Sequence, residues 1–215
     1  MSEVQQEQAP VSITKKNQLI IYLLVGGLIA VGAIFGYTEF YQKPLEAKAA
    51  DAMYVAEKYF ANDSSTLVLQ GDGLNKGVLY IIKEYSGTKA ANLAKYYAGM
   101  SYYRLKDYNK AIEYLKDFST NAKQVQAVAY GSIGDAYSEL KKNEEAIEYY
   151  KKAGTHFPED EAISSEYLFR AASFLELNGQ NDAAIEIYKQ IKQNYPKSEK
   201  GFSIDKYINR LQVQP

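Results

Sequence analysis

Few residues in this sequence have the types and spacing that chemistry requires. His156 is the only histidine and cysteine is absent, so a zinc or thiolate site would lack partners at ligand spacing. The segment His156-Phe157-Pro158 instead predicts a helix end, where a histidine interacts with the last carbonyl groups and the helix dipole. We therefore expect neither a catalytic nor a metal-binding role for His156, and no cofactor.

Two polar segments resemble ligand-binding loops only in composition. Segment 70–77 (QGDGLNKG) is rich in glycine, but a phosphate-binding P-loop requires G-x-x-x-x-G-K-[ST] after a buried strand. Segment 62–65 (NDSS) does not continue as a calcium loop, which needs Gly at its sixth position and Glu at its twelfth. The carboxylate pairs at 144–145 and 160–161 lie near predicted helix N-termini, where negative charge is favoured. The sequence therefore predicts a binding protein and not an enzyme.

The charge balance argues against nucleic acid as a partner. The chain has 215 residues with 25 Lys and Arg against 26 Asp and Glu, which leaves a net charge of −1. Without a basic domain, the chain has little with which to neutralise a phosphate backbone. Tyrosine is unusually common, with 21 Tyr beside 8 Phe and no Trp.

The first element of the chain is an apolar segment. Leu19 to Tyr37 contains 19 consecutive residues without a charge, and as a helix it would be about 28 Å long, close to the roughly 30 Å hydrocarbon core of a bilayer. We expect residues 18–37 to form a transmembrane helix and the polar residues 1–17 to form a disordered tail. A cleaved signal peptide is the alternative, because Ala30-Val31-Gly32 offers small residues at a suitable spacing. Signal-peptide apolar regions are shorter, at roughly 7–15 residues.

Flanking charges predict the orientation of this span. Lys15 and Lys16 precede it, whereas the residues after it carry mixed charges. Because positive charge stays on the cytoplasmic side, we expect the tail to be cytoplasmic and residues 38–215 to lie on the far side of the membrane.

Gly32 and Gly36 form a GxxxG pair inside the span. Such a pair lets two helices approach closely and would support a homodimer. The alternative is that glycine is simply frequent in transmembrane helices.

The rest of the chain repeats with a period near 36 residues. Two series of small residues recur at intervals of 35 and 38 residues. The first series is Gly99, Gly134 and Ala172, and the second is Ala111, Ala146 and Ala184. Each repeat predicts two amphipathic helices that cross at these small residues. Turns are expected at 106–107, 141–143 and 178–180, and Pro158 and Pro196 follow the second helix of their repeats. One such hairpin cannot bury its apolar face alone, so the repeats must stack.

This pattern resembles tetratricopeptide repeats, with three of them over residues 89–197. Residues 38–88 have a helical apolar period broken at 62–73, which predicts a linker helix and a degenerate first helix hairpin over 44–86. Residues 198–215 predict a C-terminal capping helix, which an open solenoid end requires. The expected fold is all-α: a transmembrane helix followed by an α-solenoid of helix hairpins.

A narrower resemblance follows from the combination of tail, span and repeats. This combination, together with segment 84–94 (EYSGTKAANLA), resembles the bacterial ancillary SecYEG translocon subunit family over nearly the whole chain. The resemblance implies a single-pass protein of the inner (cytoplasmic) membrane whose periplasmic repeats bind the secretion translocon and envelope chaperones. A self-associating anchor of an envelope complex is the alternative.

The tetratricopeptide resemblance also implies which positions face a ligand. They lie on the first helix of each repeat and fall on Leu93, Tyr96, Met100, Tyr103 and Arg104, then Val128, Gly131, Asp135, Ser138 and Glu139, then Glu166, Phe169, Ser173, Glu176 and Leu177. These residues predict a groove with an aromatic end and an acidic end that selects basic or amide-rich peptide. A solvated groove with a few packing aromatics is the alternative. Capture of a C-terminal carboxylate is disfavoured, because Tyr96, Met100 and Glu166 occupy the positions where clamping Lys and Asn residues would stand.

Overall fold

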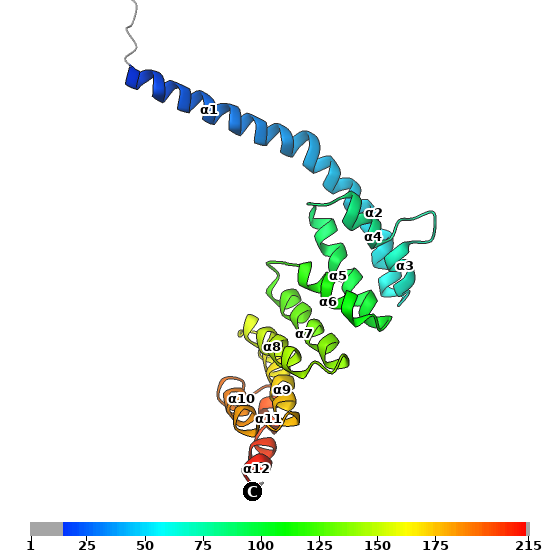
Figure 1. Cartoon of the computed structure of the whole chain (residues 1–215), viewed down its shortest axis with the longest axis vertical. Helices are drawn as coiled ribbons and strands as arrows, with labels where there is room; N and C mark the ends of the chain where they lie inside the picture. Colours follow the sequence, from blue (N-terminus) through cyan, green and yellow to red (C-terminus); the bar gives the residue numbers. More distant parts are fainter. Residues whose placement is uncertain (1–14, 214–215) are drawn as a thin grey trace, which may run out of the picture. The chain divides into compact units, whose positions relative to one another are not determined.

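A computed structural model describes residues 15–213 of the chain (Figure 1). The predicted tail at 1–17 lies outside the described residues, except for Lys15 to Asn17, which belong to the first helix. The chain divides into two compact parts, an N-terminal part, Met1–Leu45, and a repeat part, Glu46–Pro215. The described residues are helical apart from turns and one isolated antiparallel bridge between Gly71 and Lys76.

The N-terminal part contains the apolar helix that the sequence predicts. Helix α1 runs from Lys15 to Tyr37 and continues through the π-helical turn η1 (Thr38–Gln42) into α2 (Lys43–Ala61). All the large apolar side chains from Leu19 to Phe35 are exposed. Within the described residues this is the one helix long and apolar enough to cross a membrane.

The first layer of the repeat part corresponds to the expected degenerate hairpin. Helix α2 is its first helix, and its second helix is split into α3 (Ser65–Gln70) and α4 (Val78–Glu84) by the loop 71–77. A Cβ on Gly77 would lie 2.3 Å from the carbonyl oxygen of Leu69, so the chain passes itself too closely for a side chain there. Buried side chains from these three helices, among them Met53, Val68 and Ile81, form the core of this layer together with Ala90, Ala94 and Ala98 of the helix that follows.

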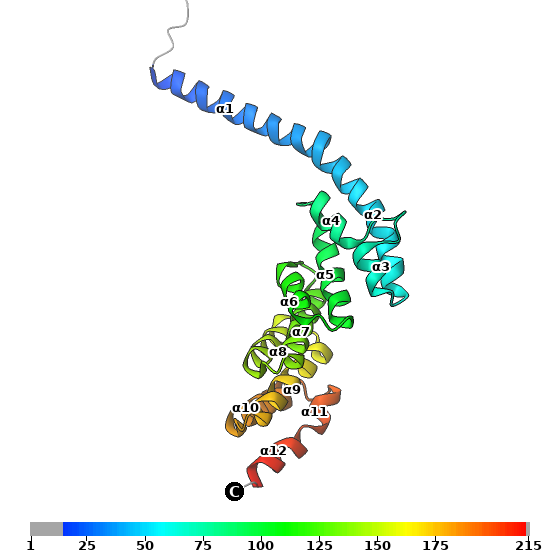
Figure 2. The same ribbon diagram turned by 45° about the vertical axis from the view of Figure 1, so that its right-hand side comes forward.

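Three antiparallel helix pairs follow, and Figures 1 and 2 show them stacked in chain order. They are α5 (Lys89–Arg104) with α6 (Tyr108–Asp117), α7 (Lys123–Glu139) with α8 (Asn143–His156), and α9 (Glu161–Leu177) with α10 (Asn181–Asn194). These pairs lie within the predicted range 89–197.

The turn inside each pair has the same geometry. Lys106, Lys141 and Gly179 occupy equivalent positions and all adopt the left-handed conformation, with φ of 63°, 60° and 72°. In each turn the next residue donates its backbone N–H to a carbonyl five residues earlier, as Asp107 does to Tyr102 at 2.9 Å. This bonding satisfies carbonyl groups that the end of a helix would leave unpaired. The three predicted turns are therefore confirmed.

Glycine permits the close crossing of the helices in the first two pairs. A Cβ on Gly99 would lie 2.5 Å from Cγ of Leu115, and one on Gly134 would lie 2.7 Å from the ring of Tyr150. Real Cβ atoms essentially never lie this close to a neighbour, so a larger residue at either position would force Leu115 or Tyr150 to move.

The C-terminus corrects the expected single capping helix. The structure has two short helices, α11 (Glu199–Ser203) and α12 (Asp205–Val213), which meet at a bend (Figure 2). Ile204 at the bend is fully buried. A Cβ on Gly201 would lie 1.9 Å from the carbonyl oxygen of Tyr195, so α11 follows the end of α10 closely, and α12 changes direction to bury its own apolar side.

Candidate protein-binding groove

Helix α5 contributes the aromatic side of the candidate groove. Tyr96, Met100 and Tyr103 are all half-buried. The ring of Tyr96 packs 5.3 Å from that of Phe118, and the ring of Tyr103 packs 5.5 Å from that of Tyr108. Burial raises the pKa of Tyr96 and of Tyr103 above the ordinary value. Both phenols are therefore neutral at physiological pH and offer rigid contact surface with a polar tip.

Arg104 is directed toward the preceding layer instead of the acidic residues. Its Nη1 lies 2.9 Å from Oδ1 of Asp63 and donates to the carbonyl oxygen of Phe60 at 3.2 Å. The guanidinium also lies 4.0 Å from the centre of the Phe60 ring. These contacts attach the end of α5 to the end of α2.

Ionic contacts connect α7, α9 and α11 across neighbouring repeats. Arg170 donates from Nη1 to Oδ1 of Asp135 at 2.7 Å and from Nε to Oε1 of Glu166 at 2.8 Å. Nζ of Lys200 lies 3.1 Å from the other oxygen of Glu166. The hydroxyl of Tyr150 donates to Oδ1 of Asp135 at 2.8 Å. The structure therefore brings Asp135 and Glu166 together in one neutralised network.

The pKa values of these groups follow from burial and from their partners. Burial opposes the charge of Glu166, but hydrogen bonds from Arg170 and Lys200 outweigh it and lower the pKa of the carboxyl group. Burial likewise opposes the charge of Arg170, and the hydrogen bond to Glu166 and the charge of Asp135 raise its pKa overall. Burial and the nearby Asp135 raise the pKa of Tyr167 to about 12. The Glu166 carboxylate and the Arg170 guanidinium are thus charged at neutral pH.

The third repeat contributes less open surface than the sequence suggests. Nη2 of Arg210 lies 2.6 Å and 2.8 Å from the two oxygens of Glu176. The ring of Phe169 packs edge-on against Tyr207 with 4.8 Å between centres. Arg210 and Tyr207 belong to α12, so the C-terminal helices cover two of the predicted groove residues.

The predicted acidic end of the groove is therefore largely neutralised from within. Asp135, Glu166 and Glu176 each face a cation of the same chain. Glu139 differs, because in the described part of the chain its Oε2 accepts from the hydroxyl of Tyr108 at 3.3 Å instead of pairing with a cation. Of the predicted groove residues, the half-buried α5 aromatics and the exposed Glu139 are therefore outside these internal ion pairs.

Sequence reasoning missed three residues of this region: Tyr167, Lys200 and Arg210. Tyr167 fills the space above Gly131, where an added Cβ would lie 2.1 Å from its ring. A glycine at a ligand-facing position of one repeat is a signal that a large residue of the next repeat lies against it. Lys200 and Arg210 gave no such signal, because their positions depend on the bend between α11 and α12.

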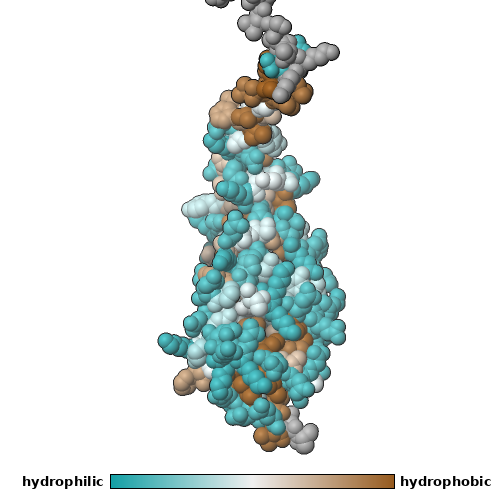
Figure 3. All heavy atoms as spheres, turned by 90° about the vertical axis from the view of Figure 1, so that its left-hand side faces the viewer, coloured by the Kyte–Doolittle hydropathy of each residue, from teal (hydrophilic) through white to brown (hydrophobic). Residues whose placement is uncertain are grey.

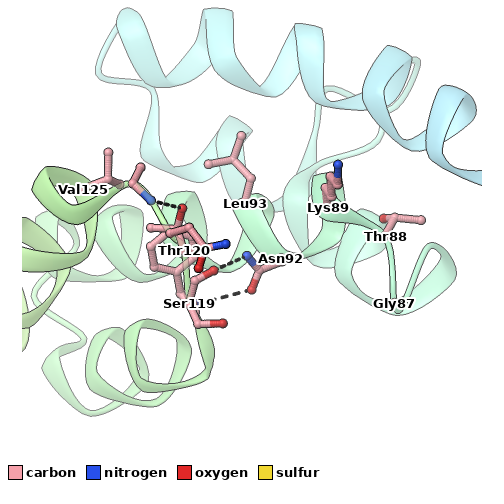
Figure 4. Close-up of a pocket in the computed structure, with 11 residues that line it drawn as sticks. Gly87, Thr88, Lys89, Asn92, Leu93, Ser119, Thr120 and Val125 are labelled. Atoms are coloured by element: carbon pink, nitrogen blue, oxygen red, sulfur yellow. Dashed lines mark hydrogen bonds between the residues drawn. The ribbon is translucent and has the colours of Figure 1, made fainter.

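A hollow extends the groove at the N-terminal ends of the first helices (Figure 4). It has a volume of about 810 Å³ and includes the predicted groove residue Leu93. Asn92 holds the loop that forms one wall, since its Nδ2 donates to the carbonyl oxygen of Ser119 at 2.7 Å and its Oδ1 accepts from the Ser119 N–H at 3.3 Å. Val125 lies on the same side of the hollow as Thr120, away from Lys89 and Thr88.

The surface of the repeat part is hydrophilic on the face seen in Figure 3, with hydrophobic residues in small patches. Within the described residues, no group of three or more His, Cys, Asp or Glu side chains is arranged to hold a metal ion.

Comparisons with known proteins agree with this architecture. Tetratricopeptide-repeat family models match residues 93–123, 127–153 and 166–198. A comparison with curated proteins found no match. One similar structure is the crystal structure of nearly identical TPR-like repeats from a Podosopora anserina putative kinesin light chain. Its TM-score is 0.56 at 12% identity, and the match covers 77% of this chain and 86% of that one. A singly substituted form of the same repeats gives a TM-score of 0.55 at 12% identity, with 77% of this chain and 85% of that one covered. Over residues 15–213 the chain is all-helical, with TPR-like solenoid repeats and an N-terminal helix that is a candidate membrane span.

Proposed function

We propose that this protein is a membrane-anchored scaffold whose repeats bind proteins of the secretion and envelope-folding machinery, either the translocon or periplasmic chaperones. Tetratricopeptide repeats generally bind proteins or peptides through an extended concave surface, which supports a binding role. The exposed apolar helix α1 supports an anchor in the inner membrane. The lysines before the span support a periplasmic location of the repeats.

The half-buried tyrosines of α5 beside Glu139 are the observation that carries this proposal. Tyrosine gives contact area at small entropic cost and is enriched at binding hot spots. Because the other groove carboxylates are neutralised within the chain, the groove favours an apolar or aromatic segment with at most one cation opposite Glu139. This differs from the basic peptide that the sequence suggests.

Co-purification of the full chain from gently solubilised membranes tests the proposal. We expect translocon subunits or envelope chaperones to be recovered with the wild type and lost with a Tyr96→Ala/Tyr103→Ala variant. Tyr80→Ala is the matched control, because Tyr80 is an exposed tyrosine on α4, away from the groove. Recovery that is equal in all three proteins would move the contact away from the groove.

A self-associating anchor is the second candidate function. A Cβ added at Gly32 or Gly36 would meet nothing within 4 Å, so this face of α1 is open to a second helix. Chemical crosslinking in detergent would give homodimers that Gly32→Ile/Gly36→Ile abolishes. If only the protein itself is recovered from membranes, this second function replaces the first.

A further inference from the structure

Outside the groove, three lysines lie against tyrosine rings. One of them belongs to α6 and the other two belong to the second repeat. Nζ of Lys116 donates to the Tyr137 hydroxyl at 2.7 Å and lies 5.3 Å from the centre of the Tyr149 ring. Nζ of Lys152 lies 4.1 Å from the centre of the Tyr130 ring and 5.6 Å from that of Tyr149. With Lys142, 5.9 Å from the Tyr137 ring, these residues form what we name the tyrosine–lysine patch.

The patch is continuous, and its positive charge has no partner within it. The ring of Tyr149 lies 5.6 Å from Tyr137 and 6.5 Å from Tyr130, which joins the two ends. Several lysines of the repeats pair with carboxylates, as Lys95 does with Asp117. Among the described side chains, no carboxylate oxygen lies within 4.0 Å of the three ammonium groups of the patch. The three lysines are exposed, so their charge is available to a partner.

Tyr137 is 9% exposed and belongs to the core, but the third repeat fills the positions of all three tyrosines with aliphatic residues. Positions 38 residues later, in the third repeat, hold Leu168, Leu175 and Ile187, which are 2%, 3% and 8% exposed. Aliphatic side chains therefore fill the same places in the same fold. In the second repeat Tyr130 and Tyr149 are only half-buried, and they bring hydroxyl groups and ring faces to the surface.

The patch and the groove lie on different sides of α7. Tyr130 and Tyr137 are seven residues apart and therefore share one side of the helix. Gly131, Asp135 and Ser138 lie between about 80° and 160° around the helix axis from them, at 3.6 residues per turn. The two surfaces can be occupied independently.

We propose that the tyrosine–lysine patch binds a short acidic segment of a partner protein. The ammonium groups and the tyrosine hydroxyls donate to carboxylates, and the ring faces contact the aliphatic part of the segment. A long polyanion fits less well, because α8 also carries Glu144, Glu145 and Glu148, and Glu145 and Glu148 lie one helical turn from Tyr149 and Lys152. Nucleic acid or an anionic membrane surface would be repelled by these carboxylates, whereas a few carboxylates in a peptide can avoid them.

Fluorescence anisotropy with the full chain in non-ionic detergent tests this proposal. The probe is a fluorescein-labelled peptide of repeated Glu-Glu-Ala, and the same peptide with Gln for Glu is its control. We expect the acidic peptide to bind and the Gln peptide not to bind. Changing Lys116, Lys142 and Lys152 together to Gln should weaken binding about tenfold, because each exposed charge contact contributes a modest factor. Changing the same three lysines to Arg should restore it.

A matched variant separates a local site from the loss of net charge. Lys48, Lys106 and Lys197 are exposed lysines outside the patch, and changing these three to Gln should alter the affinity by less than about twofold. The groove variant Tyr96→Ala/Tyr103→Ala should bind the peptide normally, so this result does not depend on the proposed function of the groove. Thermal melting checks that each variant is folded.

Three outcomes would overturn the proposal. The first is equal loss in both triple variants, which would mean that only net charge matters. The second is no binding of the acidic peptide to the folded wild type. The third is preferential binding of single-stranded DNA or of phosphatidylglycerol vesicles that depends on Lys116, Lys142 and Lys152, which would assign the patch to a different class of partner.

Discussion

Nη1 of Arg170 lies 2.7 Å from Oδ1 of Asp135, and this contact joins α9 to α7 in the preceding repeat. The same Asp135 oxygen accepts from the buried hydroxyl of Tyr150 at 2.8 Å. One carboxylate therefore satisfies two donors from two different helices. It also means that Asp135 stabilises the stacking of the repeats and is not free to select a basic ligand.

Removal of the Asp135 carboxylate should destabilise the repeats. In Asp135→Ala the Tyr150 hydroxyl, on a side chain only 2% exposed, loses its acceptor, and we expect a cost of about 1–3 kcal/mol. Asp135→Asn keeps an acceptor oxygen and should cost less than about 1 kcal/mol, because partly exposed ion pairs contribute little. Urea denaturation of the full chain in detergent, followed by circular dichroism, measures both. Equal costs for the two variants would show that the hydroxyl bond is unimportant.

Two glycine substitutions should differ in cost because of what surrounds them. A Cβ on Gly154 would lie 2.9 Å from the backbone nitrogen of Leu168 and 3.0 Å from the backbone oxygen of Ser164. The backbone cannot move aside, so Gly154→Ala should cost about 1–3 kcal/mol. A Cβ on Gly131 would meet only the far end of the Tyr167 ring. Gly131→Ala should therefore cost less, and the same denaturation experiment would refute this ranking if the order were reversed.

Acid should destabilise the third repeat through two carboxyl groups. Hydrogen bonding, first from the backbone N–H of Ile163, lowers the pKa of Asp160 below 3.8, and the contacts of Glu166 lower its pKa below 4.5. When the folded pKa is lowered, the stabilisation is complete above the ordinary pKa and is lost as the pH falls through the folded value. The melting temperature of the wild type should fall more between about pH 5 and pH 3 than that of Asp160→Asn/Glu166→Gln. Parallel curves for the two proteins would contradict the assignment.

The conformation of the loop 71–77 should depend on the Asp72 carboxylate and not on the side chain of Leu74. Asp72 accepts from the Asn75 N–H at 2.6 Å and from the Tyr59 hydroxyl at 2.7 Å. Hydrogen bonding, chiefly from the Asn75 backbone, lowers the pKa of this carboxyl group. Asp72→Ala should make the loop several-fold more sensitive to limited proteolysis. Leu74→Ser should leave the melting temperature unchanged, because Leu74 is 92% exposed; a large drop would mean that the leucine packs against the protein.

Much of the fold could be predicted from the sequence, because its signals are local. The intervals between Gly99, Gly134 and Ala172 identify the helix crossings, and those glycines meet large neighbours in the structure. The turns follow from the residues that end one helix and start the next. The break at Ile204 could not be predicted, since the apolar period of residues 198–212 suits one helix as well as two.

The charge of the groove was harder to predict than its shape. The resemblance to tetratricopeptide repeats implies which positions face inward, but a carboxylate's partner depends on contacts between repeats. Lys200 reaches Glu166 because α11 packs against α9, and Arg210 reaches Glu176 from α12, which packs against α10. Sequence spacing contains no information about these distances, so the sequence suggests an acidic surface where the structure has a neutralised network.

Site-specific photo-crosslinking in intact membranes is the most direct test of the groove as the binding surface. A benzophenone side chain would replace Tyr103 or Glu139 in the full chain, and control chains would carry it at the exposed positions Tyr80 on α4 or Leu74 in the loop. We predict adducts with a translocon subunit or an envelope chaperone from the two groove positions and none from the controls. Adducts from the control positions alone, or only homodimers from every position, would contradict the groove as the binding surface.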